Sequence, residues 1–94
     1  MTTPEGRVKA EIKRYLKARG AYFFMPVQTG YGSTTLDFLV CLNGRFIGIE
    51  AKSLIGQPTP RQLAVMREIM ATGGFAMLAR SAYDVDHAFQ VAGI

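Results

Sequence analysis

Two acidic residues and a lysine stand inside apolar segments where packing alone would favour hydrophobic side chains. Asp37 precedes the apolar run 38–42, and Glu50 and Lys52 lie at the end of the run 45–52. Carboxylate oxygens are hard ligands that suit Mg²⁺ or Mn²⁺ better than zinc. A divalent cation held by such groups acidifies water and stabilises charge on a phosphate. These three residues are therefore the candidate reactive groups of the chain.

An Asn-Gly pair between the two apolar runs predicts a hairpin, because both residues tolerate the positive φ angles of a type I′ turn. If residues 43–44 form the two-residue loop, Leu42 pairs with Arg45 and the register is fixed along both strands. Counting back from the turn, Asp37 falls directly opposite Glu50.

Directly opposite residues have Cβ atoms about 4.5–5.5 Å apart, so two carboxylates in these positions repel each other. A divalent cation between them reverses the sign of that interaction. Lys52 lies on the same face as Glu50, since side chains alternate along a strand. The pattern predicts a cation site with a lysine beside it. The alternative is that Asp37 begins a strand and that Glu50 and Lys52 form a solvated pair on an edge strand.

The same register divides the remaining hairpin residues between two faces. One face is apolar and ready to take a helix, and it is expected to carry Leu36, Phe38, Val40, Ile47, Ile49 and Ala51. The face of the charged residues also holds Leu39, Cys41, Phe46 and Gly48. We expect this second face to be half covered, with its charged end open, and Cys41 to be a small buried apolar residue.

A first helix is predicted to begin at Pro4, with Thr3 as its N-cap. Its buried stripe contains Val8, Ile12, Tyr15 and Leu16 at helical spacing. Glu5 points towards the same side, and as a first-turn acid it would also complement the helix dipole. The opposite face is basic and would either hold phosphate or simply be solvated; it carries Arg7, Lys13, Arg14 and Lys17.

A strand over residues 21–27 and a loop over residues 28–34 are expected to follow. Tyr31 in that loop would stack on a base or pack on the protein surface, and Ser33 is a candidate backbone contact. The loop lies immediately upstream of the strand that carries Asp37, so it would sit beside the site. An ordinary connecting loop is the alternative.

A second helix is predicted from Pro60, because Thr59 and Gln62 have the spacing of a capping box. Capping alone accounts for Gln62, and Arg61 beside it is a candidate phosphate contact. The expected buried stripe of this helix consists of Leu63, Met66, Ile69 and Met70. Residues 73–74 are a glycine pair that ends the helix. A buried strand and a last helix capped by Ser81 complete the chain.

The predicted order is helix, three strands, helix, strand and helix, which is an α/β fold with an αβββαβ core. Asp37, then a hairpin, then residues 49–52 (Ile-Glu-Ala-Lys), resembles the signature of the PD-(D/E)XK nuclease superfamily. With residues 59–62 (Thr-Pro-Arg-Gln) and the glycine pair 73–74, the chain resembles its VRR-NUC branch from Glu5 to about Ala79. Many relatives have proline before the first aspartate, where this chain has leucine.

The resemblance implies a restriction-endonuclease-like core with a mixed sheet flanked by helices, and Mg²⁺ or Mn²⁺ as cofactor. It implies that Asp37, Glu50 and the Ala51 carbonyl hold the metal, with Glu5 contributing from the first helix. Lys52 would orient or deprotonate water or stabilise the transition state. The resemblance also gives Gln62 a second role, positioning the lysine, the water or the scissile phosphate.

The resemblance further implies a DNA substrate, with branched DNA such as a Holliday junction preferred, and a homodimer whose two sites cut two strands. One alternative is a non-catalytic nucleic-acid-binding or assembly module that keeps the fold. Another is a restriction-type endonuclease, although the chain leaves little room for a recognition domain.

Composition agrees with a single enzyme domain over residues 1–94. The net charge of +4 and the pI of about 9.6 suit a polyanion-binding protein. One cysteine excludes an internal disulfide, so a reducing cytoplasm is the expected setting. The sequence lacks a signal-peptide pattern and any apolar run of membrane-spanning length.

Overall fold

In the part of the chain that the structure describes, three helices and four strands follow one another in the predicted order. The computed structural model describes residues 2–27 and 35–94, so Tyr31 and Ser33 lie outside the described residues. The elements are α1 (Pro4–Ala18), β1 (Tyr22–Phe24), β2 (Phe38–Leu42), β3 (Arg45–Ala51), α2 (Pro60–Ala71), β4 (Phe75–Ala79) and α3 (Ala82–Ala92). In the described part of the chain, no helix is long and apolar enough to cross a membrane.

The strands form one mixed sheet in the order β1-β2-β3-β4. The pairs β1–β2 and β2–β3 are antiparallel, whereas β3 and β4 are parallel and joined through α2. Asn43 and Gly44 have φ angles of 52° and 75°, as the two positions of a type I′ turn require. Leu42 therefore pairs with Arg45, and the pairing runs back to Phe38 opposite Ile49. The predicted hairpin register is confirmed.

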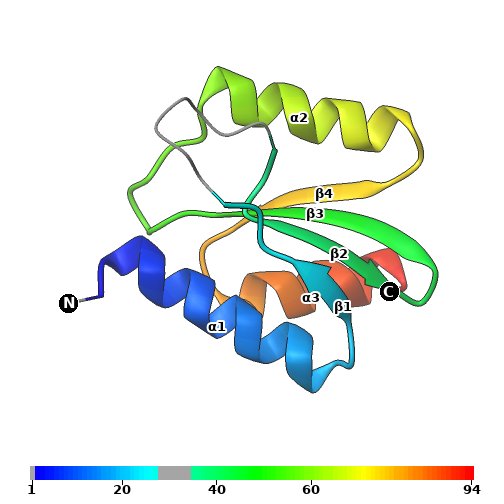
Figure 1. Cartoon of the computed structure of the whole chain (residues 1–94), viewed down its shortest axis with the longest axis horizontal. Coiled ribbons are helices and arrows are strands. Elements are labelled where there is room, and N and C mark those ends of the chain that lie inside the picture. Colours follow the sequence, from blue (N-terminus) through cyan, green and yellow to red (C-terminus); the bar gives the residue numbers. More distant parts are fainter. Residues whose placement is uncertain (1, 28–34) are drawn as a thin grey trace.

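Helices cover both faces of the sheet, with α2 on one side and α1 and α3 on the other (Figure 1). The larger core lies between the sheet and the α1–α3 layer, and its fully buried side chains include Ile12, Leu16, Phe38, Ile49 and Phe89. The smaller core lies beneath α2 and consists of Leu36, Val65, Met66 and Ile69. Both helical layers begin at the end of the sheet where β3 finishes.

The expectation that Leu36 shares a face with Phe38 and Val40 is wrong. Leu36 is fully buried, but it belongs to the core beneath α2. Regular pairing of β2 begins only at Phe38, so strand alternation does not extend back to position 36. The expected stripe of α2 is also rotated, because Leu63 and Met70 are exposed and Val65 is buried in their place.

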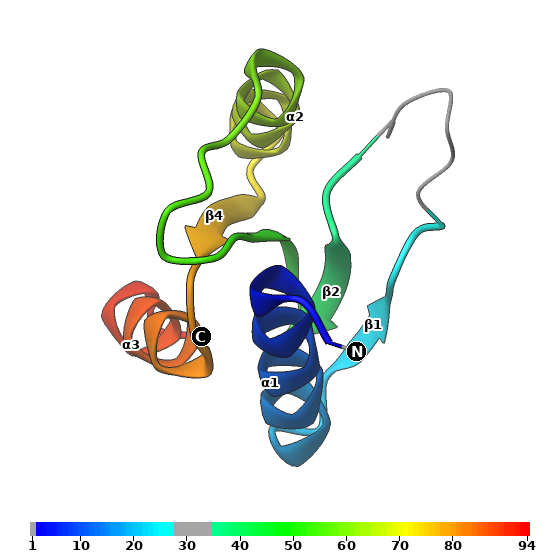
Figure 2. The same ribbon diagram turned by 90° about the vertical axis from the view of Figure 1, so that its left-hand side faces the viewer.

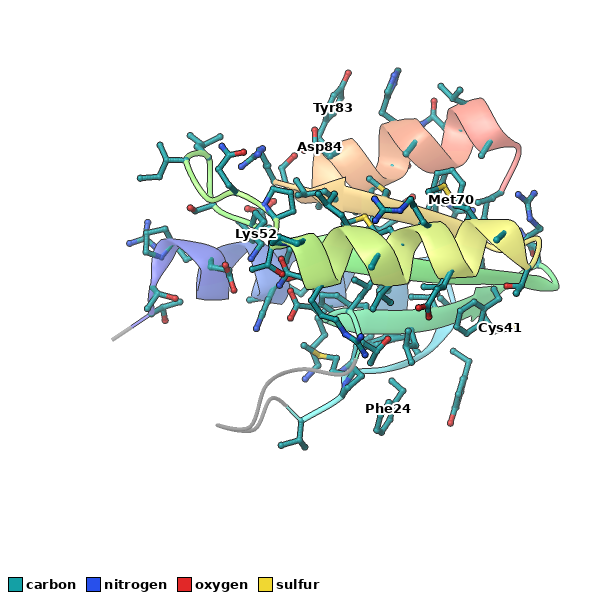
Figure 3. All side chains as sticks on the ribbon, turned by 90° about the horizontal axis from the view of Figure 1, so that it is seen from above. Phe24, Cys41, Lys52, Met70, Tyr83 and Asp84 are labelled. Carbon is teal, nitrogen blue, oxygen red and sulfur yellow. The ribbon has the colours of Figure 1, made fainter. Side chains whose placement is uncertain are left out.

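The expectation that Cys41 is buried is also wrong, because its side chain is exposed. Helix α2 lies over the β3–β4 half of its sheet face and leaves the β1–β2 half without a helix (Figure 2). Figure 3 shows Cys41 and Phe24 beside α2 rather than beneath it. Tyr22 and Phe46 are exposed on the same part of the molecule.

A glycine lets α2 approach the sheet closely. A Cβ atom added at Gly48 would lie 2.6 Å from Ile69 Cδ1 and 2.8 Å from Leu36 Cδ1. Both distances are far below van der Waals contact, so α2 packs directly against the backbone of β3. This close approach matters for function because Gly48 precedes Glu50 by two residues on the same face of the strand.

We predict that Gly48→Ala destabilises the protein by about 1–3 kcal/mol, as overpacking of a filled core does. The added methyl group meets the Cδ1 atoms of Ile69 and Leu36. Ile69→Val removes one of these atoms, so the double variant should recover part of the loss relative to the sum of the two single changes. Urea denaturation of the four proteins measures the coupling, and strict additivity would contradict the packing described.

Candidate active site

Asp37 and Glu50 form a buried cross-strand pair at the end of the β2–β3 hairpin. Their exposed fractions are 5% and 3%. The Asp37 N–H donates to Glu50 Oε1 over 3.2 Å, and the Ala51 N–H donates to Asp37 Oδ2 over 2.9 Å. Each carboxylate thus accepts a backbone hydrogen bond from the opposite segment. These bonds hold the two acids together beyond the last regular ladder pair.

Gln62 joins the start of α2 to this pair. Its Oε1 accepts from the Thr59 N–H over 2.9 Å, while the Thr59 hydroxyl accepts from the Gln62 N–H over 3.1 Å. The predicted capping box is therefore confirmed. The remaining end of the same side chain, Nε2, donates to Glu50 Oε2 over 2.9 Å. One end of the Gln62 side-chain amide therefore completes the capping box, and the other end contacts the site.

Two lysines flank the carboxylates from different elements. Lys52 Nζ lies 3.6 Å from Glu50 Oε2, and its side chain is 12% exposed. Figure 3 shows Lys52 at the end of the sheet where α2 begins. Lys9, on α1, lies 3.3 Å from Asp37 Oδ1 and 3.9 Å from Glu5 Oε2. The pair is therefore partly neutralised by one ammonium group on each side.

Sequence reasoning missed Lys9. The available signal was its position four residues after Glu5 and directly after the buried Val8, which puts it at the edge of the buried stripe. The structure places Glu5 in contact with Lys9 rather than with either buried carboxylate. In the described ranges, no three acidic, histidine or cysteine side chains gather closely enough to hold a metal ion. Glu5 as a metal ligand stays a prediction.

Glu50 has a strongly perturbed acidity. Burial raises its pKa, the neighbouring Asp37 charge raises it further, and the Lys52 ammonium opposes both effects, which leaves the pKa at about 7. Burial and the Asp37 charge therefore outweigh the Lys52 ammonium group in setting the protonation of Glu50 near neutral pH. Such a site is suited to bind an additional cation through its oxygen atoms.

The predicted phosphate-contacting side chains of the described residues are all exposed; they are Arg7, Arg14, Lys17 and Arg61. Arg61 is next to Gln62 at the start of α2, so it lies at the site's end of the sheet. Lys17 follows Lys9 by eight residues, which corresponds to about 12 Å along a helix. The basic face of α1 therefore leads away from the carboxylate pair.

Comparison with solved structures finds a chain described as "VRR_NUC domain" that is similar to this one, with a TM-score of 0.77 and 26% identity. The match covers 95% of this chain and 97% of that chain. No family model and no curated protein matches the sequence. The similarity covers nearly the whole chain and confirms the α/β fold expected from the resemblance.

The raised pKa of Glu50 predicts how the stability of the metal-free protein depends on pH. The folded protein keeps a proton on Glu50 between its ordinary pKa near 4.5 and about 7, whereas the unfolded chain releases it. The free energy of unfolding should therefore fall as pH rises through this interval, by an amount on the order of 1–3 kcal/mol from this group.

Urea denaturation in EDTA at several pH values measures this effect, with Glu50→Gln as the variant that has no proton to release. The comparison concerns the slope with pH, because the substitution also alters the contact with Gln62. A flatter profile in the variant is expected. Equal slopes in the two proteins would show that Glu50 does not titrate abnormally.

Proposed function

We infer that this chain is a divalent-metal-dependent endonuclease that hydrolyses DNA phosphodiester bonds. Its similarity to a chain described as "VRR_NUC domain" supports a nuclease-type domain. The observation that carries the proposal is the buried pair of Asp37 and Glu50 with Lys52 beside it. Burying two adjacent carboxylates is costly unless they are paired or bind a cation. A domain with a purely structural role gains nothing from that cost.

The donor set fits a hard divalent cation. Asp37 and Glu50 supply carboxylate oxygens, the Ala51 carbonyl follows directly in the chain, and Glu5 on α1 is proposed as a further oxygen donor. A cation bound here would lower the pKa of Glu50, which burial and the neighbouring Asp37 charge raise in its absence. A cation bound here would supply Lewis acidity, acidifying water and stabilising charge on the phosphate.

Lys52 is proposed to act on the phosphate or on the attacking water. Its Nζ atom lies 3.6 Å from Glu50 Oε2, beside the proposed cation site. From there it would orient or deprotonate the water, or stabilise the developing negative charge by electrostatics. Gln62 orients Glu50 by its hydrogen bond, and Arg61 is proposed to hold a phosphate of the DNA backbone.

We propose branched DNA as the preferred substrate and a homodimer as the active form. A junction has two strands to be cut symmetrically, and a twofold dimer supplies two equivalent sites. The net charge of +4 supports DNA binding in general but does not choose among DNA structures. A reducing cytoplasm is the proposed setting, since the chain has a single cysteine.

We predict that Asp37→Asn and Lys52→Met each lower Mg²⁺- or Mn²⁺-dependent DNA cleavage by about 100-fold or more, since each removes a charge at the reacting phosphate. Glu68→Gln and Arg67→Met are matched controls, because they remove the same charge types from exposed positions on α2.

The assay uses junction, flap, duplex and single-stranded substrates with Mg²⁺, Mn²⁺ or EDTA. Full activity in the Asp37→Asn/Lys52→Met double variant would refute the assigned site. Equal cleavage of every DNA form would remove the preference for branched DNA and leave the hydrolytic activity standing. A wild-type protein that neither cleaves DNA nor binds Mn²⁺ would favour the non-catalytic module.

Replacing Lys9 is predicted to strengthen cation binding at the site rather than to weaken it. Its ammonium group lies 3.3 Å from Asp37 Oδ1 and would compete with an incoming cation. Lys9→Met should therefore tighten Mn²⁺ binding roughly three- to tenfold, which corresponds to about 1 kcal/mol of removed competition. Titration calorimetry measures the affinity, with Lys13→Met as the control on the same helix. Weaker binding in Lys9→Met would mean that Lys9 supports the site instead.

A further inference from the structure

Two large apolar side chains stand almost fully exposed just beyond the proposed catalytic lysine. Leu54 and Ile55 have exposed fractions of 83% and 89%. They are the two central residues of a turn, because the Gly56 N–H donates to the Ser53 carbonyl over 3.2 Å. Central turn positions usually hold glycine, proline or small polar residues. An adjacent leucine and isoleucine at such a tip are therefore unexpected on structural grounds.

This turn is held firmly at both ends. One guanidinium nitrogen of Arg80, Nη1, donates to the Ser53 carbonyl and, over 2.8 Å, to the Gly56 carbonyl. The Ser53 hydroxyl also accepts from the Gly56 N–H over 3.2 Å, and the Lys52 N–H donates to the Ala79 carbonyl over 3.0 Å. Hydrogen bonds therefore hold the turn that carries the apolar tip in place, and Arg80 contributes two of them.

The turn is also in contact with the site. A Cβ atom added at Gly56 would lie 3.4 Å from Lys52 Cδ, so the closing residue of the turn packs on the stem of this lysine. Leu54 follows Lys52 by two residues, which limits their Cα separation to about 7 Å. The segment between β3 and α2 projects from the end of the sheet where α1 and α2 begin (Figure 1). The turn that carries Leu54 and Ile55 therefore lies next to Lys52.

We propose that Leu54 and Ile55 form a wedge that contacts the bases of the DNA next to the cleaved phosphodiester bond. This inference rests on the proposed nuclease function. A DNA backbone held at Lys52 and Arg61 brings its bases within reach of a tip that is two residues from Lys52. Apolar side chains of this kind insert between base steps and partly unstack them in other DNA-binding proteins.

With such a wedge, the turn that carries Leu54 and Ile55 determines which DNA structures the protein prefers to cleave. Insertion into a continuous duplex must break base stacking, whereas a branch point or an interrupted strand offers a step that is already weakened. The wedge therefore favours cleavage beside interruptions of the double helix. Preference for branched DNA would then come from Leu54 and Ile55, and the hydrolytic step from Asp37, Glu50 and Lys52.

The test compares the wild type with Leu54→Ser/Ile55→Ser. The control is Val91→Ser, which removes an apolar side chain that is 76% exposed on α3. A four-way junction with 2-aminopurine at the branch point reports base unstacking by fluorescence in EDTA. The ratio of cleavage rates on junction and single-stranded DNA is then measured with Mn²⁺. Thermal denaturation and Mn²⁺ calorimetry check that each variant folds and keeps its site.

The tip variant is expected to lose the fluorescence increase and to lower the cleavage ratio by about tenfold, in line with the loss of two buried apolar contacts. Val91→Ser should match the wild type. Arg80→Met should lower the ratio in the same direction, because it frees the turn without changing the tip.

A tip variant with wild-type fluorescence and cleavage ratio would overturn the wedge, and loss of cleavage in Asp37→Asn would then leave the nuclease function standing. A tip variant that instead changes the oligomeric state on gel filtration would overturn the wedge in favour of a protein contact. A wild-type protein that cleaves no DNA would overturn the nuclease function and the wedge together.

Discussion

The structure depends on the burial of two carboxylates side by side across the β2–β3 hairpin. Asp37 and Glu50 are nearly inaccessible to solvent, and like charges in such a position destabilise the fold. The raised pKa of Glu50 is the direct sign of that cost. Folding therefore requires compensating partners from the rest of the chain, and the arrangement of the helices can be understood from where those partners come.

Each layer of the fold contributes one of these partners. The backbone of the hairpin donates to both acids, α2 contributes the amide of Gln62, and α1 contributes the ammonium group of Lys9. The close packing of Ile69 on Gly48 holds α2 against β3, and the start of that helix contacts Glu50 through Gln62. The pKa of Glu50 stays raised despite these partners, so a divalent cation bound between the two acids would offset the repulsion that remains.

Much of this arrangement follows from local sequence signals. The Asn43-Gly44 turn fixes the hairpin register because few other residue pairs accept two positive φ angles in succession. The capping box at Thr59 marks the start of α2 because its spacing is short and specific. These signals alone predict that Asp37 faces Glu50. They act over a few residues, so tertiary packing cannot displace them easily.

The features that sequence could not predict depend on how far each helix extends over the sheet. Cys41 is exposed because α2 covers the β3–β4 half of its face, and no local pattern records that offset. Lys9 reaches Asp37 because of the position of α1 relative to β2. The exposure of Leu54 and Ile55 has a different origin, because they lie in the turn between β3 and α2, and apolar residues are ordinarily expected inside the protein.

The central claim is that the Asp37–Glu50 pair holds a divalent cation for phosphodiester hydrolysis. Its most direct test is a crystal structure with Mn²⁺ bound at a pH above 7, where anomalous scattering locates the ion without assumptions about activity. The account predicts a peak that contacts a carboxylate oxygen of both residues, with the ammonium group of Lys9 moved away from Asp37. DNA cleavage in solution by a protein whose Mn²⁺ binds elsewhere, or not at all, would contradict it.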